Sequence, residues 1–160
     1  MSFDHAFSLG AQIAENVSEA ELLKALEPLT EYFGITGFTE KSKWNDRSIM
    51  FDKTTRDLII NTSGNVSYGF SDRVEEALAN LGPLTTHADC GYLTDHSTGD
   101  LNTAIQECWF GPTKESILTA QRDAVLGESL NLMKQYLPKP MFETVSQMLA
   151  EVMKTPIVQH

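Results

Sequence analysis

An alternation of apolar and polar side chains over the first thirteen residues is the feature that most constrains the fold. Every second residue from Phe3 to Ile13 is apolar except His5, and the residues between them are small or polar. Because successive side chains of a strand point to opposite faces of a sheet, this pattern predicts a strand with one buried face.

A switch to helical spacing follows this strand. Ser18 and Glu21 have the spacing of a capping box, in which each side chain accepts a hydrogen bond from the other residue's backbone N–H. Large apolar residues then recur at helical spacing as far as Gly34, a helix-ending residue. Pro28 lies inside this segment and is expected to kink or restart the helix.

The middle of the chain reads as strands and a second helix. Three short strands are predicted at 48–52, 57–61 and 66–70. The residues Thr62-Ser63-Gly64-Asn65 predict a hairpin-type connection between the last two of these strands. Asp72 and Glu75 then have capping-box spacing and predict a short helix that ends at Gly82.

A further hairpin and two helices complete the predicted elements. Strands are expected at 88–94 and 101–110, and helices at 112–137 and 140–154. The order β-α-β-β-β-α-β-β predicts an α+β fold of the ferredoxin-like or α/β-plait type, an antiparallel sheet with helices on one face. We expect an α+β sandwich domain over 1–111. The C-terminal helical hairpin, 112–160, would pack on that domain or form a dimer surface.

Charge and cysteine content narrow the function classes. Twelve basic and twenty-two acidic residues give a net charge of −10, which disfavours binding of nucleic acid or anionic membrane. No secretion signal is recognised, and no apolar run reaches the roughly 18 residues that a membrane helix needs. Two cysteines do not make a secreted disulfide framework, so a cytoplasmic, reducing location is expected.

The charges are unevenly distributed along the chain. From Val74 to Thr113 there is no lysine or arginine, whereas five of the twelve basic residues lie between Lys41 and Arg56. An acidic side and one small basic patch are therefore expected. With residues 4–13 set aside, the order helix, three strands, helix, two strands, helix resembles that of acidic secretion chaperones, in element order alone.

One cluster of residues could support catalysis, depending on the register of the 88–110 hairpin. A two-residue turn at Thr98-Gly99 would place Asp89 opposite Cys108, with His87 beside them. That trio could act as a nucleophile set or as three ligands of an open zinc site. A three-residue turn would instead place Cys90 opposite Cys108.

The same two-residue turn predicts which face of the hairpin is buried. The apolar face would consist of Ala88, Cys90, Tyr92, Ile105 and Trp109, interrupted by Glu107. No nucleotide-binding, zinc-protease, hydrolase or redox motif occurs, so no cofactor or metal is expected.

The leading hypothesis is therefore a small acidic cytosolic protein-binding or regulatory protein, of the inhibitor, immunity or chaperone type, without catalysis. Tryptophan and arginine are enriched at interface hot spots, and acidic surfaces attract basic partners. The candidate partner-binding residues are Lys41, Lys43, Trp44, Arg47, Asp89, Asp95, Asp100 and Glu107.

Two alternative functions and one candidate homodimer interface remain open. The first alternative is a small hydrolase or transferase that uses His87, Asp89 and Cys108. The second is a small-molecule sensor whose ligand lies between the sheet and the C-terminal helices. A homodimer could form through one face of the last helix, which carries Met141, Val145, Met148 and Val152.

Overall fold

The structure is a computed structural model that describes residues 2–67, 69–95 and 104–155. The chain divides into two compact units, 1–113 and 114–160, which are described separately. The elements of the first unit are β1 (Ser2–Gln12), α1 (Glu19–Ala25), α2 (Glu27–Phe33), β2 (Arg47–Phe51), β3 (Asp57–Ser67), α3 (Phe70–Leu81), β4 (Asp89–Asp95) and β5 (Ala104–Phe110). The second unit consists of α4 (Lys114–Tyr136) and α5 (Lys139–Lys154).

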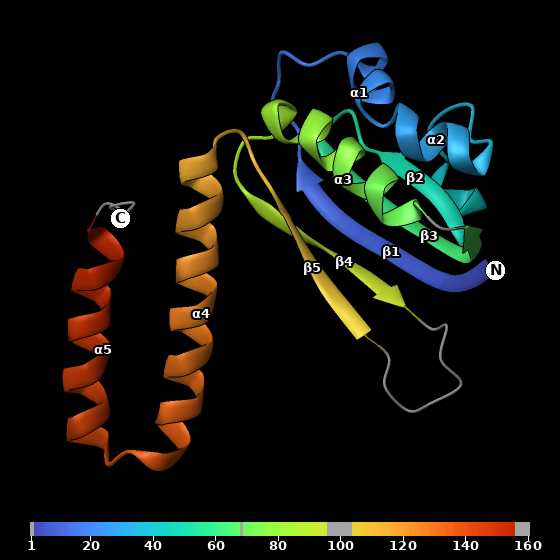
Figure 1. Ribbon diagram of the computed structural model, residues 1–160. Helices are drawn as coiled ribbons and strands as arrows, with labels where there is room; N and C mark the ends of the chain where they lie inside the picture. The colour runs from blue at the N-terminus through green and yellow to red at the C-terminus, as the bar shows by residue number, and fades with distance from the viewer. Residues whose placement is uncertain (1, 68, 96–103, 156–160) are drawn as a thin grey trace. The chain divides into compact units, whose positions relative to one another are not determined.

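The first unit confirms the predicted fold class. Its strands form one antiparallel sheet in the order β2-β3-β1-β4-β5, and α1, α2 and α3 lie together on one face of this sheet (Figure 1). The order of the first four strands is that of a ferredoxin-like plait, and β5 extends it at one edge. The N-terminal strand β1 is therefore the central strand, paired along its whole length with β3.

The hydrophobic core lies between the sheet and the three helices. From β1 it takes the predicted buried residues Phe7, Leu9 and Ala11, and Ile13 follows directly after the strand. The other strands and the helices contribute Ile49, Leu58, Ile60, Leu93, Phe110, Leu22, Leu26, Leu29, Phe70, Val74 and Leu81. A side chain at Gly91 would come within about 3.2 Å of Phe7 and Leu9, so the backbone of β4 packs tightly against this core.

The first helical segment forms as predicted. Ser18 Oγ accepts a hydrogen bond from the backbone N–H of Glu21 at 3.2 Å, and the Glu21 carboxylate accepts one from the backbone N–H of Ser18 at 2.8 Å. These bonds hold the pKa of Glu21 below its usual range. Pro28 occupies the first turn of α2, so the segment restarts there, and Gly34 ends it with a left-handed backbone, φ +66°.

Two local predictions in the middle of the chain are wrong. Residues 57–67 form one continuous strand instead of two strands joined by a turn, because every residue from 57 to 67 pairs with β1. Gly64 is therefore a strand residue, and the Arg47 guanidinium occupies the space beside it. The helix α3 begins at Phe70 with Gly69 as its cap, two residues before the predicted capping Asp72.

This correction also changes the comparison of element order. With β1 set aside, two strands rather than three lie between the first helical segment and α3. The order that resembled the acidic secretion chaperones is therefore not the order of this fold.

The second unit is the predicted helical pair. The helices α4 and α5 run antiparallel and side by side (Figure 1). Arg122 of α4 donates hydrogen bonds to the carbonyls of Met153 and Thr155, each at 2.6 Å, at the C-terminal end of α5. In the described part of the chain, no helix combines the length and the hydropathy that crossing a membrane requires.

Candidate protein-binding surface

The face of the sheet opposite the helices carries exposed apolar side chains; we call it the open face. Its register places Asn61, Ser8, Tyr92 and Glu107 in one row across β3, β1, β4 and β5. The exposed fractions of its large apolar side chains are 39% for Ile59, 47% for Tyr92 and 66% for Ile105. Exposed apolar groups gathered on one surface are typical of interaction sites.

The register of the β4–β5 hairpin differs from the predicted one. Asp89 pairs with Phe110, Cys90 with Trp109 and Gly91 with Cys108, a shift of two residues from the two-residue-turn alternative. The three-residue-turn alternative, with Cys90 opposite Cys108, is also wrong. The predicted tip at Ser97–Asp100 lies outside the described residues.

The predicted buried face of this hairpin is in fact the open one. Leu93, Cys108 and Phe110 are buried beneath the helices, whereas Tyr92, Ile105 and Glu107 are exposed. Both faces of the hairpin carry apolar residues, so alternation alone could not decide between them. The deciding contacts are those between β4 and the buried side chains of β1, which lies about eighty residues earlier in the chain.

Aromatic rings and a carboxylate lie together at the β5 side of the open face. The Trp109 indole N–H donates to the Glu107 carboxylate at 3.0 Å, and Tyr92 lies directly across from Glu107 on β4. A carboxylate bonded to one aromatic side chain and across the strand from another can pair with a lysine or arginine, whose cation also interacts favourably with the rings. This corner of the sheet is therefore suited to a basic side chain.

A shallow hollow of about 470 Å³ lies on the open face where β1, β3 and the start of β4 meet. Gly10, Gln12, Asp57, Ile59, His87, Asp89 and Cys90 line it, together with Ala11 and Leu58. Gly10 contributes no side chain, and nothing lies within 4 Å of the position that its Cβ would take. The hollow is open to solvent and lined by polar and apolar groups.

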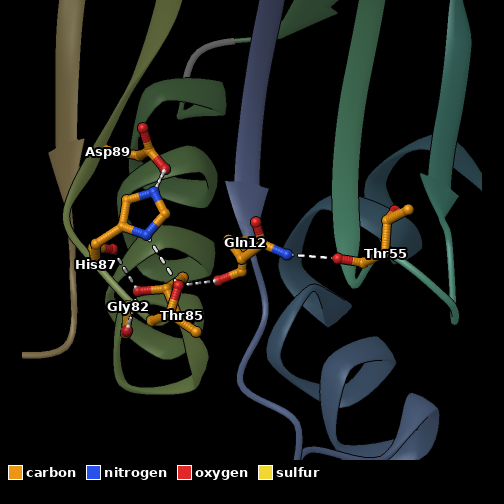
Figure 2. Close-up of polar contacts among 7 residues, drawn as sticks. Gln12, Thr55, Gly82, Thr85, His87 and Asp89 are labelled. Atoms are coloured by element: carbon orange, nitrogen blue, oxygen red, sulfur yellow. Dashed lines mark hydrogen bonds and ion pairs between the residues drawn. The ribbon is translucent and has the colours of Figure 1, made fainter.

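His87 lies at the edge of this hollow, beside the end of β1 (Figure 2). Its Nε2 is 3.1 Å from Asp89 Oδ2, and its Nδ1 is 2.9 Å from Thr86 Oγ1. The backbone N–H of Thr86 donates to the Gln12 carbonyl at 2.9 Å, which attaches this segment to β1. Because both ring nitrogens are bound to neighbouring residues, the imidazole has no nitrogen left for a ligand.

The third member of the predicted catalytic trio lies elsewhere. Cys108 is buried in the core opposite Gly91, and burial raises the pKa of its thiol. Burial also raises the pKa of Cys90 to about 11. A thiol is nucleophilic as its thiolate, so both cysteines are poorly suited to catalysis near neutral pH. Among the described residues, no group of three histidine, cysteine, aspartate or glutamate side chains could hold a metal ion.

The basic loop is at the opposite edge of the sheet. Lys41 and Lys43 lie in a 3₁₀ turn, Trp44 follows with 42% of its surface exposed, and Lys43 Nζ is 3.0 Å from Glu40. Arg47 turns toward the helices, where its guanidinium lies 5.6 Å from the Phe33 ring centroid. All four residues of this predicted site are exposed, but Arg47 points to the helical side of the sheet, so the loop itself presents Lys41, Lys43 and Trp44.

The predicted acidic residues do not form one patch. Glu107 points to the open face, whereas Asp89 belongs to the opposite side of the strand alternation and is bound to His87. Asp95 ends β4, and its side chain lies outside the described part of the structure, as does Asp100. The residues that sequence reasoning missed as a surface are Ile59, Tyr92, Ile105 and Trp109.

The chain belongs to a family of unknown function (DUF6806), whose sequence model matches residues 9–154. No curated protein and no solved structure matches the chain. The match spans both units, so the family's sequence model includes the sheet unit and the helical pair.

Proposed function

We propose that this protein binds another protein through the open face of its sheet, and that the partner presents apolar side chains flanked by lysine or arginine. The observation that carries the proposal is the exposed set Ile59, Tyr92 and Ile105 on a sheet whose other face is filled by helices. Such a surface loses unfavourable contact with water when a partner covers it.

The charge of the first unit determines the kind of partner. Residues 1–113 contain seventeen acidic and seven basic residues, a net charge of −10. None of the described side chains that the strands place on the open face is a lysine or arginine, whereas Asp57 and Glu107 lie on it. A second copy of this unit would be repelled, and a basic partner would be attracted.

Glu107 is the expected anchor for one basic side chain. Its carboxylate is held by the Trp109 indole and lies across from Tyr92, so its position is fixed before a partner arrives. Preorganised groups lose less conformational entropy on binding, and tyrosine and tryptophan are frequent hot-spot residues.

The exposed loop at Lys41, Lys43 and Trp44 is a separate proposed contact. It precedes β2 at one edge of the sheet, whereas Glu107 is on β5 at the other. Four strand spacings of about 4.8 Å separate these edges, roughly 19 Å. A partner that contacts both sites must therefore span the whole sheet.

The two free cysteines also support a reducing location such as the cytosol.

A catalytic alternative built on His87, Asp89 and Cys108 has less support. The histidine and aspartate are bound to each other, but Cys108 is in the core with a raised thiol pKa. We therefore favour binding over a thiol-dependent hydrolase or transferase.

The proposal is tested by selecting peptides from a random display library on the intact wild-type protein. We expect enriched sequences that combine apolar residues with lysine or arginine. Their affinity should fall about tenfold or more for Glu107→Lys, because an attraction becomes a repulsion next to the binding peptide. Glu31→Lys makes the same charge change on α2, on the helical side of the sheet, and should change affinity less than twofold.

Three results would contradict the proposal. They are a selection that enriches no peptide, enriched peptides that are acidic, and equal binding to the wild type and to Glu107→Lys. Circular dichroism of both variants checks that each retains the wild-type fold.

A further inference from the structure

The helical pair has no buried centre of its own. Within the described residues of α4 and α5, no side chain is fully buried. Half-buried apolar residues recur at helical spacing along each helix: Leu126, Leu130 and Met133 on α4, and Phe142, Val145, Leu149 and Met153 on α5. We assign these rows to the seam between the two helices. Two helices in contact along one seam leave the rest of their apolar surface in water, and most helical stability in proteins comes from tertiary packing.

A second apolar stripe runs along each helix beside this seam. On α4 it consists of Val125, Leu132 and Tyr136, which are 63%, 55% and 80% exposed. On α5 it consists of Met141, Met148 and Val152, which are 57%, 64% and 48% exposed. These six residues form what we call the hairpin face.

Helix geometry places both stripes on the same side of the pair. On a helical wheel with 100° per residue, each stripe lies about 100° from the seam of its own helix. On both helices this is the side reached from the seam by stepping back one residue toward the N-terminus. Because the two helices are antiparallel, equal rotations in this sense bring both stripes to one side. The hairpin face is therefore one continuous apolar surface across two helices, which is half of a four-helix bundle.

The spacing of the stripes is self-complementary under a two-fold rotation. On α5 the positions 141, 145, 148 and 152 are separated by four, three and four residues, so an antiparallel copy pairs Met141 with Val152 and Val145 with Met148. On α4 the positions 125, 129, 132 and 136 have the same palindromic spacing, with Ser129 as the one polar member.

The two palindromic stripes are centred at about the same position along the axis of the helical pair. Their centres are between Ser146 and Gln147 on α5, and between Leu130 and Asn131 on α4. Arg122 bonds to the carbonyls of Met153 and Thr155, so these positions of the two helices are level. Counting from there, each centre is about eight residues, or roughly 12 Å, along its helix. One two-fold axis can therefore pass through both centres.

The charge of this unit does not oppose a second copy. Residues 114–160 carry five acidic and five basic residues, so this unit is neutral while the first unit has the entire net charge of −10. Two hairpins can approach without net repulsion. An isologous contact of this kind is the commonest way in which protein subunits form a dimer.

We propose that the hairpin face binds the same face of a second copy, antiparallel, and closes a four-helix bundle. This proposal is independent of the open face of the sheet, because it rests on the residues of α4 and α5 alone. It extends the expected contact through Met141, Val145, Met148 and Val152 to a second stripe on α4.

The first test is the mass of the full-length protein by sedimentation equilibrium over a range of concentrations. We expect a dimer of twice the 17.8 kDa chain. Met148→Asp, at the centre of the face, should raise the dimer dissociation constant at least about a hundredfold, because it buries two unpaired carboxylates. Ala150→Asp adds the same charge on another side of α5 and should leave the dissociation constant within about threefold.

A wild-type protein that stays monomeric at high micromolar concentration overturns the proposal, and so does an equal effect of the two aspartates. A crosslinking test covers the case in which Met148→Asp unfolds the helices. In a Cys90→Ser background, a mixture of Met141→Cys and Val152→Cys chains should form a mixed disulfide dimer. Met141→Cys alone should crosslink poorly, and efficient self-crosslinking would contradict the antiparallel arrangement.

Discussion

The two units of this chain both present apolar surface to water, but they differ in charge and in what supports that surface. The sheet unit, 1–113, has a complete core on one side and a net charge of −10. The helical unit, 114–160, is neutral and has no buried residue among those described. A surface on an acidic unit with its own core can attract a basic partner, whereas a neutral hairpin without a core leaves apolar surface that further helices could cover. This difference is the basis for proposing two surfaces with two kinds of contact.

The two units should differ most in how much a leucine-to-alanine substitution lowers the free energy of unfolding. Leu93→Ala removes a side chain that is 5% exposed from the core of the sheet unit and should lower the free energy of unfolding by about 3 kcal/mol. Leu132→Ala on the hairpin face, 55% exposed, should cost less than about 1 kcal/mol in dilute, monomeric protein. Urea unfolding followed by circular dichroism measures both. Equal losses would show that the hairpin has a core of its own.

The sequence predicted the fold better than it predicted either surface. The alternation in β1, the capping box at Ser18 and the glycine at Gly34 are local signals, and the structure confirms all three. The interruption expected at Gly64 failed because a glycine inside a paired strand has the same sequence signature as a glycine in a turn.

The open face was missed for a physical reason. In the β4–β5 hairpin, apolar residues occupy both faces, so the burial of Leu93 and Cys108 rather than Tyr92 and Trp109 depends on pairing with β1. A two-residue change of register keeps each residue on its own face but changes every cross-strand neighbour. The trio of His87, Asp89 and Cys108 depended on that register.

The two surfaces should also differ in how salt changes their binding affinity, an effect of about tenfold. Binding of a basic peptide to the open face should weaken about tenfold between 50 and 500 mM sodium chloride, because screening reduces the attraction to the acidic unit. Association through the neutral hairpins should not weaken over the same range, because its apolar contacts are not screened by salt. Fluorescence anisotropy of a labelled peptide and sedimentation equilibrium provide the two measurements. A reversed pattern, with salt-sensitive dimers and salt-insensitive peptide binding, would exchange the roles assigned to the two units.

The most direct test of the account is to compare the accessibility of two thiols on β5, three residues apart. In a Cys90→Ser background, a cysteine introduced at the 66% exposed Ile105 reports on the open face, and native Cys108, 7% exposed, reports on the core face. Burial also raises the pKa of Cys108, which further reduces its thiolate fraction at pH 8. Alkylation by iodoacetamide, followed by peptide mass spectrometry, should be at least about a hundredfold faster at Ile105→Cys, because Cys108 reacts only after local opening. Comparable rates, or faster reaction at Cys108, would show that the face assigned to partner binding is covered and would contradict the account.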